Sequence, residues 1–165
     1  MLYIVMGVSG TGKTTVGRKL AGALGCAFLE GDELHPQANI EKMSCGIPLD
    51  DEDRAPWLAA IRKRLEQAAA ASADLVVACS ALKQRYRDTL GHDLPVRWIY
   101  LTGDPALLLQ RLQQRQGHYM KAGMLASQLA DLEPPDPASA VTLDVDQPVS
   151  SLVALALAAA RPAKP

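Results

Sequence analysis

The sequence is poor in aromatic side chains, and its charges nearly cancel. Aromatic residues make up 4% of the 165 residues, and there is a single phenylalanine. The 17 Lys and Arg residues face 18 Asp and Glu residues, which gives a net charge of −1. A nearly neutral chain offers no electrostatic argument for binding nucleic acid or an anionic membrane. Each basic residue therefore has to be interpreted by its position in the sequence.

Cysteine pairs and long apolar runs are also missing. Cys26, Cys45 and Cys79 are widely spaced and form no CxxC pair. Neither a zinc site nor a disulfide framework is therefore expected, and the thiols are expected to be reduced and mostly buried. The apolar start at 1–6 is too short for a signal peptide. The uncharged run at 147–160 is shorter than the roughly 18 residues of a membrane-spanning helix. These features predict a cytoplasmic protein that does not enter a membrane.

Strand-like and helix-like segments alternate along the chain. Short apolar runs, typical of strands covered on both faces, predict strands at 2–6, 26–30, 74–79, 96–101 and 141–145. Helical spacing predicts helices at 13–24, 37–44, 53–71, 83–90, 106–115, 124–132 and 149–160. No repeat or long linker divides the chain. The alternation predicts one α/β domain over residues 1–165, with a parallel five-stranded sheet flanked by helices.

The clearest motif lies between the first predicted strand and the first predicted helix. Residues 7–14, GVSGTGKT, fit the phosphate-binding pattern GxxxxGK[ST]. Glycines let the chain turn, and consecutive backbone N–H groups and the helix N-terminus attract phosphate. Lys13 can reach the β- and γ-phosphates of ATP, and the Thr14 hydroxyl can bind Mg²⁺. The predicted nucleotide-binding residues of this P-loop are Gly7, Val8, Ser9, Gly10, Thr11, Gly12, Lys13, Thr14 and Thr15.

Other motifs narrow the class of P-loop protein. Residues 88–91 match the DxxG of GTPases, but they end a helix instead of following a strand, and no NKxD motif occurs. The strand predicted at 74–79 is followed by Ser80, where a motor or RecA-type ATPase would carry an acidic residue. A small-molecule or nucleotide kinase is the large class that remains.

A carboxylate follows the second predicted strand. Asp32 leaves a strand end beside the P-loop, where it can orient a hydroxyl acceptor and accept its proton. Two alternatives stay open at this point: Asp32 could cap a helix, and His35 could make a purely structural hydrogen bond. The acidic run at 50–53 favours a turn and helix N-cap over a metal site. Trp57 is expected in the core rather than as a platform for a sugar.

Longer blocks carry a specific resemblance. The chain resembles the P-loop gluconokinases of the thermoresistant type in GVSGTGKTT at 7–15, GDELHPQANIEKMSCGIPLDDEDRAPWL at 31–58, CSALKQRYRDTL at 79–90, the HYM…LEPP stretch at 118–135 and DVDQP at 144–148. The resemblance implies phosphorylation of D-gluconate at its 6-hydroxyl by ATP and Mg²⁺. It also implies the sheet order 2-3-1-4-5 of nucleoside-monophosphate and shikimate kinases, a lid at about 111–131, and a homodimer. A shikimate kinase or a non-catalytic nucleotide-binding regulator are the alternatives.

The resemblance also implies roles for individual residues. Gluconate needs hydrogen-bonding groups for its hydroxyls and a basic side chain for its carboxylate. The implied substrate-binding residues are Asp32, His35, Lys42, Arg54, Lys83 and Arg87, although Lys42 and Arg87 taken alone favour ordinary surface charges. By similarity to shikimate kinases, Glu30 would hold Mg²⁺ through water together with Thr14, with Glu in place of Asp. Arg111 and Arg115 resemble the lid arginines that cover ATP, which makes Lys13, Asp32 and Arg115 the implied catalytic set.

Overall fold

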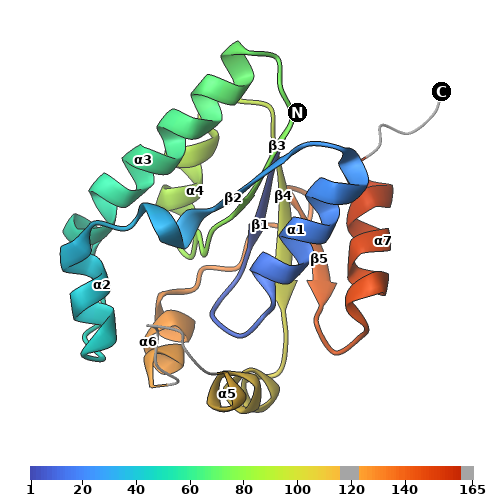
Figure 1. The fold of residues 1–165 in the computed structure, drawn as a ribbon. Helices are drawn as coiled ribbons and strands as arrows, with labels where there is room; N and C mark the ends of the chain where they lie inside the picture. Colours follow the sequence, from blue (N-terminus) through green and yellow to red (C-terminus); the bar gives the residue numbers. More distant parts are fainter. Residues whose placement is uncertain (116–122, 161–165) are drawn as a thin grey trace.

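The computed structural model describes residues 1–115 and 123–160 and shows one parallel sheet. Its strand order is β2-β3-β1-β4-β5 (Figure 1). The strands are β1 (Leu2–Met6), β2 (Ala27–Glu30), β3 (Leu75–Ala78), β4 (Val96–Thr102) and β5 (Ala140–Asp144). The α/β class, the five strands and their order are confirmed.

Helices cover both faces of the sheet. The helices are α1 (Lys13–Leu24), α2 (Gln37–Ser44), α3 (Asp51–Ala70), α4 (Gln84–Gly91), α5 (Pro105–Gln114), α6 (Met124–Asp131) and α7 (Val149–Ala160), with a 3₁₀ turn η1 at Gly31–Leu34. Figure 1 shows α1 and α7 on one face and α3 and α4 on the other, while α5 and α6 lie near the carboxyl ends of the strands. The 3₁₀ turn was not expected from the sequence.

A capping box starts α3 two residues earlier than expected. The Asp53 backbone N–H donates to Asp50 Oδ1 at 2.8 Å, and the Asp50 backbone N–H donates to Asp53 Oδ2 at 3.0 Å. This reciprocal pair satisfies donors at the helix start that otherwise have no partner. The interpretation of the acidic run as a helix N-cap is confirmed.

The central strand is buried on both faces. Leu2, Ile4 and Met6 pack in the cluster with α3 and α4, and Tyr3 and Val5 pack in the cluster with α1 and α7. This alternation across one strand explains why its sequence is apolar at nearly every position. Trp57 of α3 is 1% exposed, so the core position expected for it is confirmed.

The thiol and membrane expectations have different outcomes. Cys79 is buried, but Cys26 is half-buried and Cys45 is exposed, so the expectation of mostly buried thiols is wrong. Cys45 is exposed because it caps the surface end of the short helix α2.

Within residues 1–115 and 123–160, no helix is long and apolar enough to cross a membrane.

The first turn after β2 passes very close to β3. A Cβ atom on Gly31 would lie 2.4 Å from the Ala78 carbonyl oxygen, a backbone atom that cannot rotate away. The absence of a side chain at Gly31 therefore lets the chain leave β2 directly beside the end of β3. This path places Asp32, the next residue, at the carboxyl edge of the sheet.

Gly31→Ala should destabilise the fold, because the added methyl group forces β2 and β3 apart. We expect a loss of about 1–3 kcal/mol in the free energy of unfolding, the usual cost of overpacking. Urea denaturation measures it. The control is Gly22→Ala on the exposed side of α1, where nothing lies within 4 Å of the new Cβ. That change should stabilise by about 0.5–1 kcal/mol; equal effects at the two positions would contradict the steric argument.

Candidate active site

The P-loop joins the end of β1 to the start of α1. Gly7 has φ +146°, and a Cβ there would lie 2.4 Å from the Leu101 carbonyl oxygen of β4. Only glycine fits this combination of backbone angle and close approach. The Thr11 hydroxyl donates to the Val8 carbonyl at 2.8 Å and closes the loop on itself. No side chain caps the N-terminus of α1, and its first turn holds no acidic residue. Its N–H groups therefore suit an anion.

A cleft of about 350 Å³ lies over this loop. It is lined by Ser9, Gly10, Gly12, Lys13, Thr14, Thr15, Asp32, Arg111, Gln114 and Arg115. The structure thus gathers six of the nine predicted P-loop residues, the carboxylate after β2, Arg111 of α5 and Arg115 just after that helix around one space. Gly7, Val8 and Thr11 are buried and support the loop from behind.

The two arginines differ in their bonding. Arg111 Nη2 donates to the Val145 carbonyl at 3.0 Å, after β5, so its guanidinium is partly committed to the backbone. Arg115 ends α5 and is exposed at the rim of the cleft. Residues 116–122 of the expected lid, with the HYM block, lie outside the described residues.

Lys13 brings a positive charge into the cleft. Its Nζ donates to the Val8 carbonyl at 3.1 Å. Loss of solvent lowers the pKa of Lys13, whereas the nearby Asp32 and Glu30 carboxylates act in the opposite direction. A partly desolvated ammonium group in a loop of N–H donors is suited to phosphate.

Glu30 and Thr14 place two oxygen atoms side by side. The Thr14 hydroxyl donates to Glu30 Oε2, across the gap between the end of β2 and the start of α1. Burial raises the pKa of Glu30, while the Thr14 hydrogen bond opposes that shift. In the described part of the chain, no group of three or more His, Cys, Asp or Glu side chains could hold a metal ion.

A second, smaller pocket of about 30 Å³ lies behind Asp32. Its lining comprises Asp32, His35, Met43, Leu49, Arg54, Trp57, Ser80, Leu82, Met124, Ser127 and Gln128. Asp32 lines this pocket and also the cleft over the P-loop. The carboxylate therefore lies at the boundary between the two spaces, and η1 carries it there.

One face of α6 forms a wall of the second pocket. Met124, Ser127 and Gln128 recur at the spacing of one helical face, and all three line the pocket. Gln128 Oε1 accepts a hydrogen bond of 2.7 Å from the Ser9 backbone N–H, so the same face also contacts the P-loop. The sequence prediction missed Gln128, although it lies in a block that carried the family resemblance.

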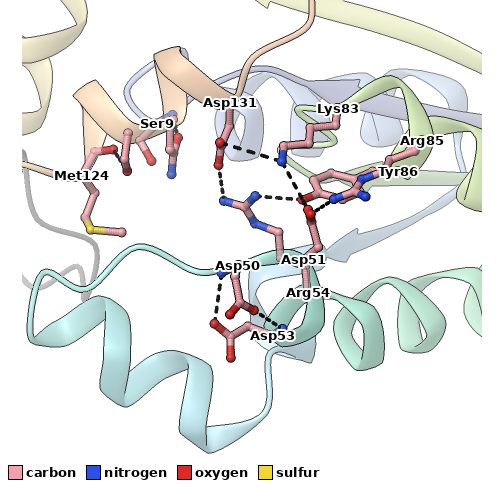
Figure 2. Close-up of polar contacts among 12 residues, drawn as sticks. Ser9, Asp50, Asp51, Asp53, Arg54, Lys83, Arg85, Tyr86, Met124 and Asp131 are labelled. Carbon is pink, nitrogen blue, oxygen red and sulfur yellow. Dashed lines mark hydrogen bonds and ion pairs between the residues drawn. The ribbon is translucent and has the colours of Figure 1, made fainter.

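Arg54 lies in a cluster of charges between α3, α4 and α6. Arg54 Nη2 pairs with Asp131 Oδ2 at 2.9 Å, and its Nη1 donates to the Tyr86 hydroxyl at 2.9 Å (Figure 2). Lys83 Nζ lies 3.3 Å from Asp51 Oδ1 and 4.0 Å from Asp131 Oδ1. Arg85 also pairs with Asp51. The ion pairs of this cluster thus join Arg54, Lys83 and Arg85 to the carboxylates of Asp51 and Asp131.

Three of the predicted substrate-binding residues do not line the second pocket: Lys83, which pairs with Asp51 beside it, and Lys42 and Arg87, which bond elsewhere. Lys42 Nζ pairs with both Asp53 carboxylate oxygens at 2.9 Å. Arg87 donates to the carbonyl oxygens of Ala81 at 2.9 Å and Leu82 at 3.1 Å, and it lines a different cavity. Arg87 therefore holds the loop before α4. The structure shows no contact in support of substrate binding by Lys42 or Arg87, and those roles stay predictions.

Comparison with known proteins shows which family the chain resembles. Residues 2–135 match a family model described as an AAA domain. A gluconokinase of Gluconobacter oxydans (strain 621H) is 54% identical over 133 residues, 80% of this chain and 75% of that protein. The thermoresistant gluconokinase of Escherichia coli (strain K12) is 43% identical over 156 residues, 93% and 89% of the two chains. The crystal structure of a gluconokinase from Sinorhizobium meliloti 1021 matches with a TM-score of 0.84 and 48% identity, over 94% of this chain and 89% of that one.

Lys13→Met should weaken ATP binding without unfolding the protein. A hydrogen bond to a charged group contributes about 1.5–3 kcal/mol, so we expect a loss of affinity of about 10–100-fold. Since solvent loss disfavours the charged lysine, the unliganded variant should be at least as stable as the parent. Calorimetric titration with ATP and thermal unfolding measure the two effects. The control, Lys19→Met on the exposed side of α1, should leave affinity unchanged; normal ATP affinity in a folded Lys13→Met variant would contradict the assignment.

Proposed function

The chain belongs to the gluconokinase family of P-loop proteins. From that premise we propose that it transfers the γ-phosphoryl group of ATP to the 6-hydroxyl of D-gluconate. Asp32 acts as the base that accepts the proton of that hydroxyl. The resemblance inferred from the sequence motifs is confirmed. The position of Asp32, lining both the P-loop cleft and the second pocket, is the observation that carries the proposal. A homodimer and a cytoplasmic location are further proposals that rest on the resemblance and the composition.

The reaction needs a hydroxyl oxygen aligned with the γ-phosphorus. As the new O–P bond forms and the bond to the ADP oxygen breaks, Asp32 accepts the hydroxyl proton and later returns it to solvent. Lys13 neutralises charge that develops on the transferring group, as does the arginine of α5 that closes on it. Of the two, Arg115 is exposed at the cleft rim, and Arg111 already donates to the Val145 carbonyl. This difference favours Arg115 for that role.

Thr14 and Glu30 fit a magnesium ion bound together with ATP. Mg²⁺ prefers oxygen ligands, keeps several waters and is usually held by one or two protein groups plus phosphates. The adjacent Thr14 hydroxyl and Glu30 carboxylate supply groups of that kind beside the P-loop. The ion would neutralise phosphate charge when bound.

Arg54 and the neighbouring Lys83 suit a substrate carboxylate. Arg54 is buried and lines the second pocket, and Lys83 reaches the same Asp131 carboxylate. The carboxylate of gluconate would accept charge-assisted hydrogen bonds from these two side chains. At about 30 Å³ the pocket holds roughly one water molecule. Entry of a six-carbon acid therefore requires its walls to separate.

Asp32→Asn should reduce turnover far more than nucleotide binding. The amide keeps the size of the side chain but cannot accept the proton, and loss of general-base catalysis costs about 10²–10⁴-fold in kcat. Coupled ADP-release kinetics with gluconate and calorimetric titration with ATP separate the two effects. The adjacent exposed Glu33→Gln variant removes the same charge and should keep normal kcat. Reduced ATP affinity with unchanged kcat in Asp32→Asn would refute the base assignment.

Glucose should be a poor substrate, since it has the terminal hydroxyl of gluconate but no carboxylate. A site built around a missing polar partner can discriminate by about 10⁴–10⁵-fold in kcat/KM, and less where solvent reaches the charge. Arg54→Ala should raise the KM for gluconate much more than the KM for ATP. It should also reduce the difference in kcat/KM between gluconate and glucose. Arg64→Ala, an exposed change on the same helix, is the matched control. Comparable kcat/KM for glucose and gluconate in the unmodified enzyme would exclude carboxylate recognition.

A further inference from the structure

The imidazole of His35 is held in one plane beside Asp32. His35 follows η1, is buried, and lines the second pocket. Its ring stacks on the indole of Trp57, with 4.3 Å between ring centroids and 11° between planes. The Trp57 indole is itself fixed, since its Nε1–H donates to the Gly31 carbonyl at 2.8 Å. The remaining question is which nitrogen of the ring carries the proton.

Two contacts of the Asn39 side chain of α2 determine which nitrogen of His35 carries the proton. Its amide nitrogen Nδ2 donates to the Asp53 backbone carbonyl at 2.8 Å. A carbonyl oxygen can only accept, so the nitrogen end of the amide must face it, and the orientation of the amide is fixed. The same nitrogen lies 3.2 Å from His35 Nδ1. Its second N–H is the donor in that contact, which makes Nδ1 the acceptor.

A neutral imidazole with an accepting Nδ1 carries its proton on Nε2. His35 is neutral at pH 7, because burial, with a smaller contribution from Arg54, lowers its pKa to about 4 against the opposing effect of Asp32. The ring is therefore a hydrogen-bond donor through Nε2, and its one available lone pair, on Nδ1, is engaged by the Asn39 amide. Among the described residues that line the second pocket, Asp32 is the sole carboxylate.

We propose that Asn39 is a positioning residue that fixes His35 as a donor, through Nε2–H, to an oxygen atom of the acceptor substrate. The proposal rests on the proposed function of the second pocket. It separates two roles: His35 holds an acceptor oxygen by donating to it, and Asp32 alone accepts the hydroxyl proton. With the other tautomer, His35 Nε2 would accept hydrogen bonds and compete with Asp32 for the same proton.

The tautomer can be measured directly on the unmodified protein. In ¹⁵N NMR of histidine-labelled enzyme at pH 7, the proton of His35 should reside on Nε2, with Nδ1 unprotonated. His35→Ala identifies the resonances. A proton on Nδ1, or an imidazolium at pH 7, would overturn the proposal. This measurement does not depend on turnover, so it tests the tautomer whether or not the protein phosphorylates gluconate. Failure to phosphorylate gluconate would count against the proposed function alone.

Asn39→Asp tests the consequence for substrate binding. A carboxylate at this position cannot donate to Nδ1, so Nδ1 should carry a proton. In the neutral ring Nε2 then loses its donor function, and the ¹⁵N spectrum of the variant distinguishes this neutral ring from an imidazolium, which would keep both N–H groups. We expect the KM for gluconate to rise about tenfold or more, with the KM for ATP unchanged. The substrate oxygen would lose the hydrogen bond from His35 Nε2–H and would face an unprotonated nitrogen instead. Gln37→Glu makes the same amide-to-acid change on the exposed side of α2 and should leave both values unchanged.

His35→Gln supplies the rescue experiment. Its amide can donate in place of Nε2–H, so it should retain more gluconate affinity than His35→Ala. An Asn39→Asp enzyme with the parent tautomer and the parent KM for gluconate would refute the proposal. Equal KM values for His35→Gln and His35→Ala would refute it as well. If Asn39→Asp does not fold, the NMR measurement on the unmodified protein and the comparison of His35→Gln with His35→Ala still test the proposal.

Discussion

The hydrogen bond from the Trp57 indole to the Gly31 carbonyl holds the acceptor half of the site in place. Trp57 belongs to the core between α3 and the sheet, and Gly31 is the residue at which β2 ends against β3. Asp32 is the next residue after Gly31, and His35 follows at the end of η1, where it also stacks on the indole. Because these groups are attached to the packed core and not to a free loop, their positions depend on how α3 packs. Catalytic groups need such rigid support to keep productive geometry.

The cations of the site already lie near carboxylates before any ligand enters. Lys13 lies near the Asp32 and Glu30 carboxylates, and Arg54 pairs with Asp131. An unpaired buried charge costs several kcal/mol, so such pairing makes the unliganded fold affordable. Ligand anions therefore join or replace protein carboxylates at these cations instead of meeting bare charges. Specificity then depends on how well the anionic groups of the ligand fit the space and the hydrogen-bond donors that remain beside these carboxylates.

Local motifs could be recognised from the sequence, and contacts between distant segments could not. The P-loop, the strand order and Asp32 were predicted, because glycine spacing, apolar runs and family blocks are properties of short segments. Gln128 and Asn39 were missed as site residues, since their roles come from contacts with Ser9 and His35 that depend on helix packing. Arg87 shows the reverse case: its block matched the family, but its guanidinium bonds to backbone carbonyls near its own helix.

The strand that carries the P-loop is the first in the chain and the central one in the sheet. Leu2 pairs with Leu75 of β3 on one side and with Val96 of β4 on the other. On the ribosome, β1 therefore emerges long before either neighbour and stays an unpaired apolar segment until both have been synthesised. Pairings between such distant residues form slowly and leave hydrophobic surface exposed meanwhile. The P-loop, although encoded within residues 7–15, therefore cannot reach its folded setting between β3 and β4 until residues 75–102 have been synthesised.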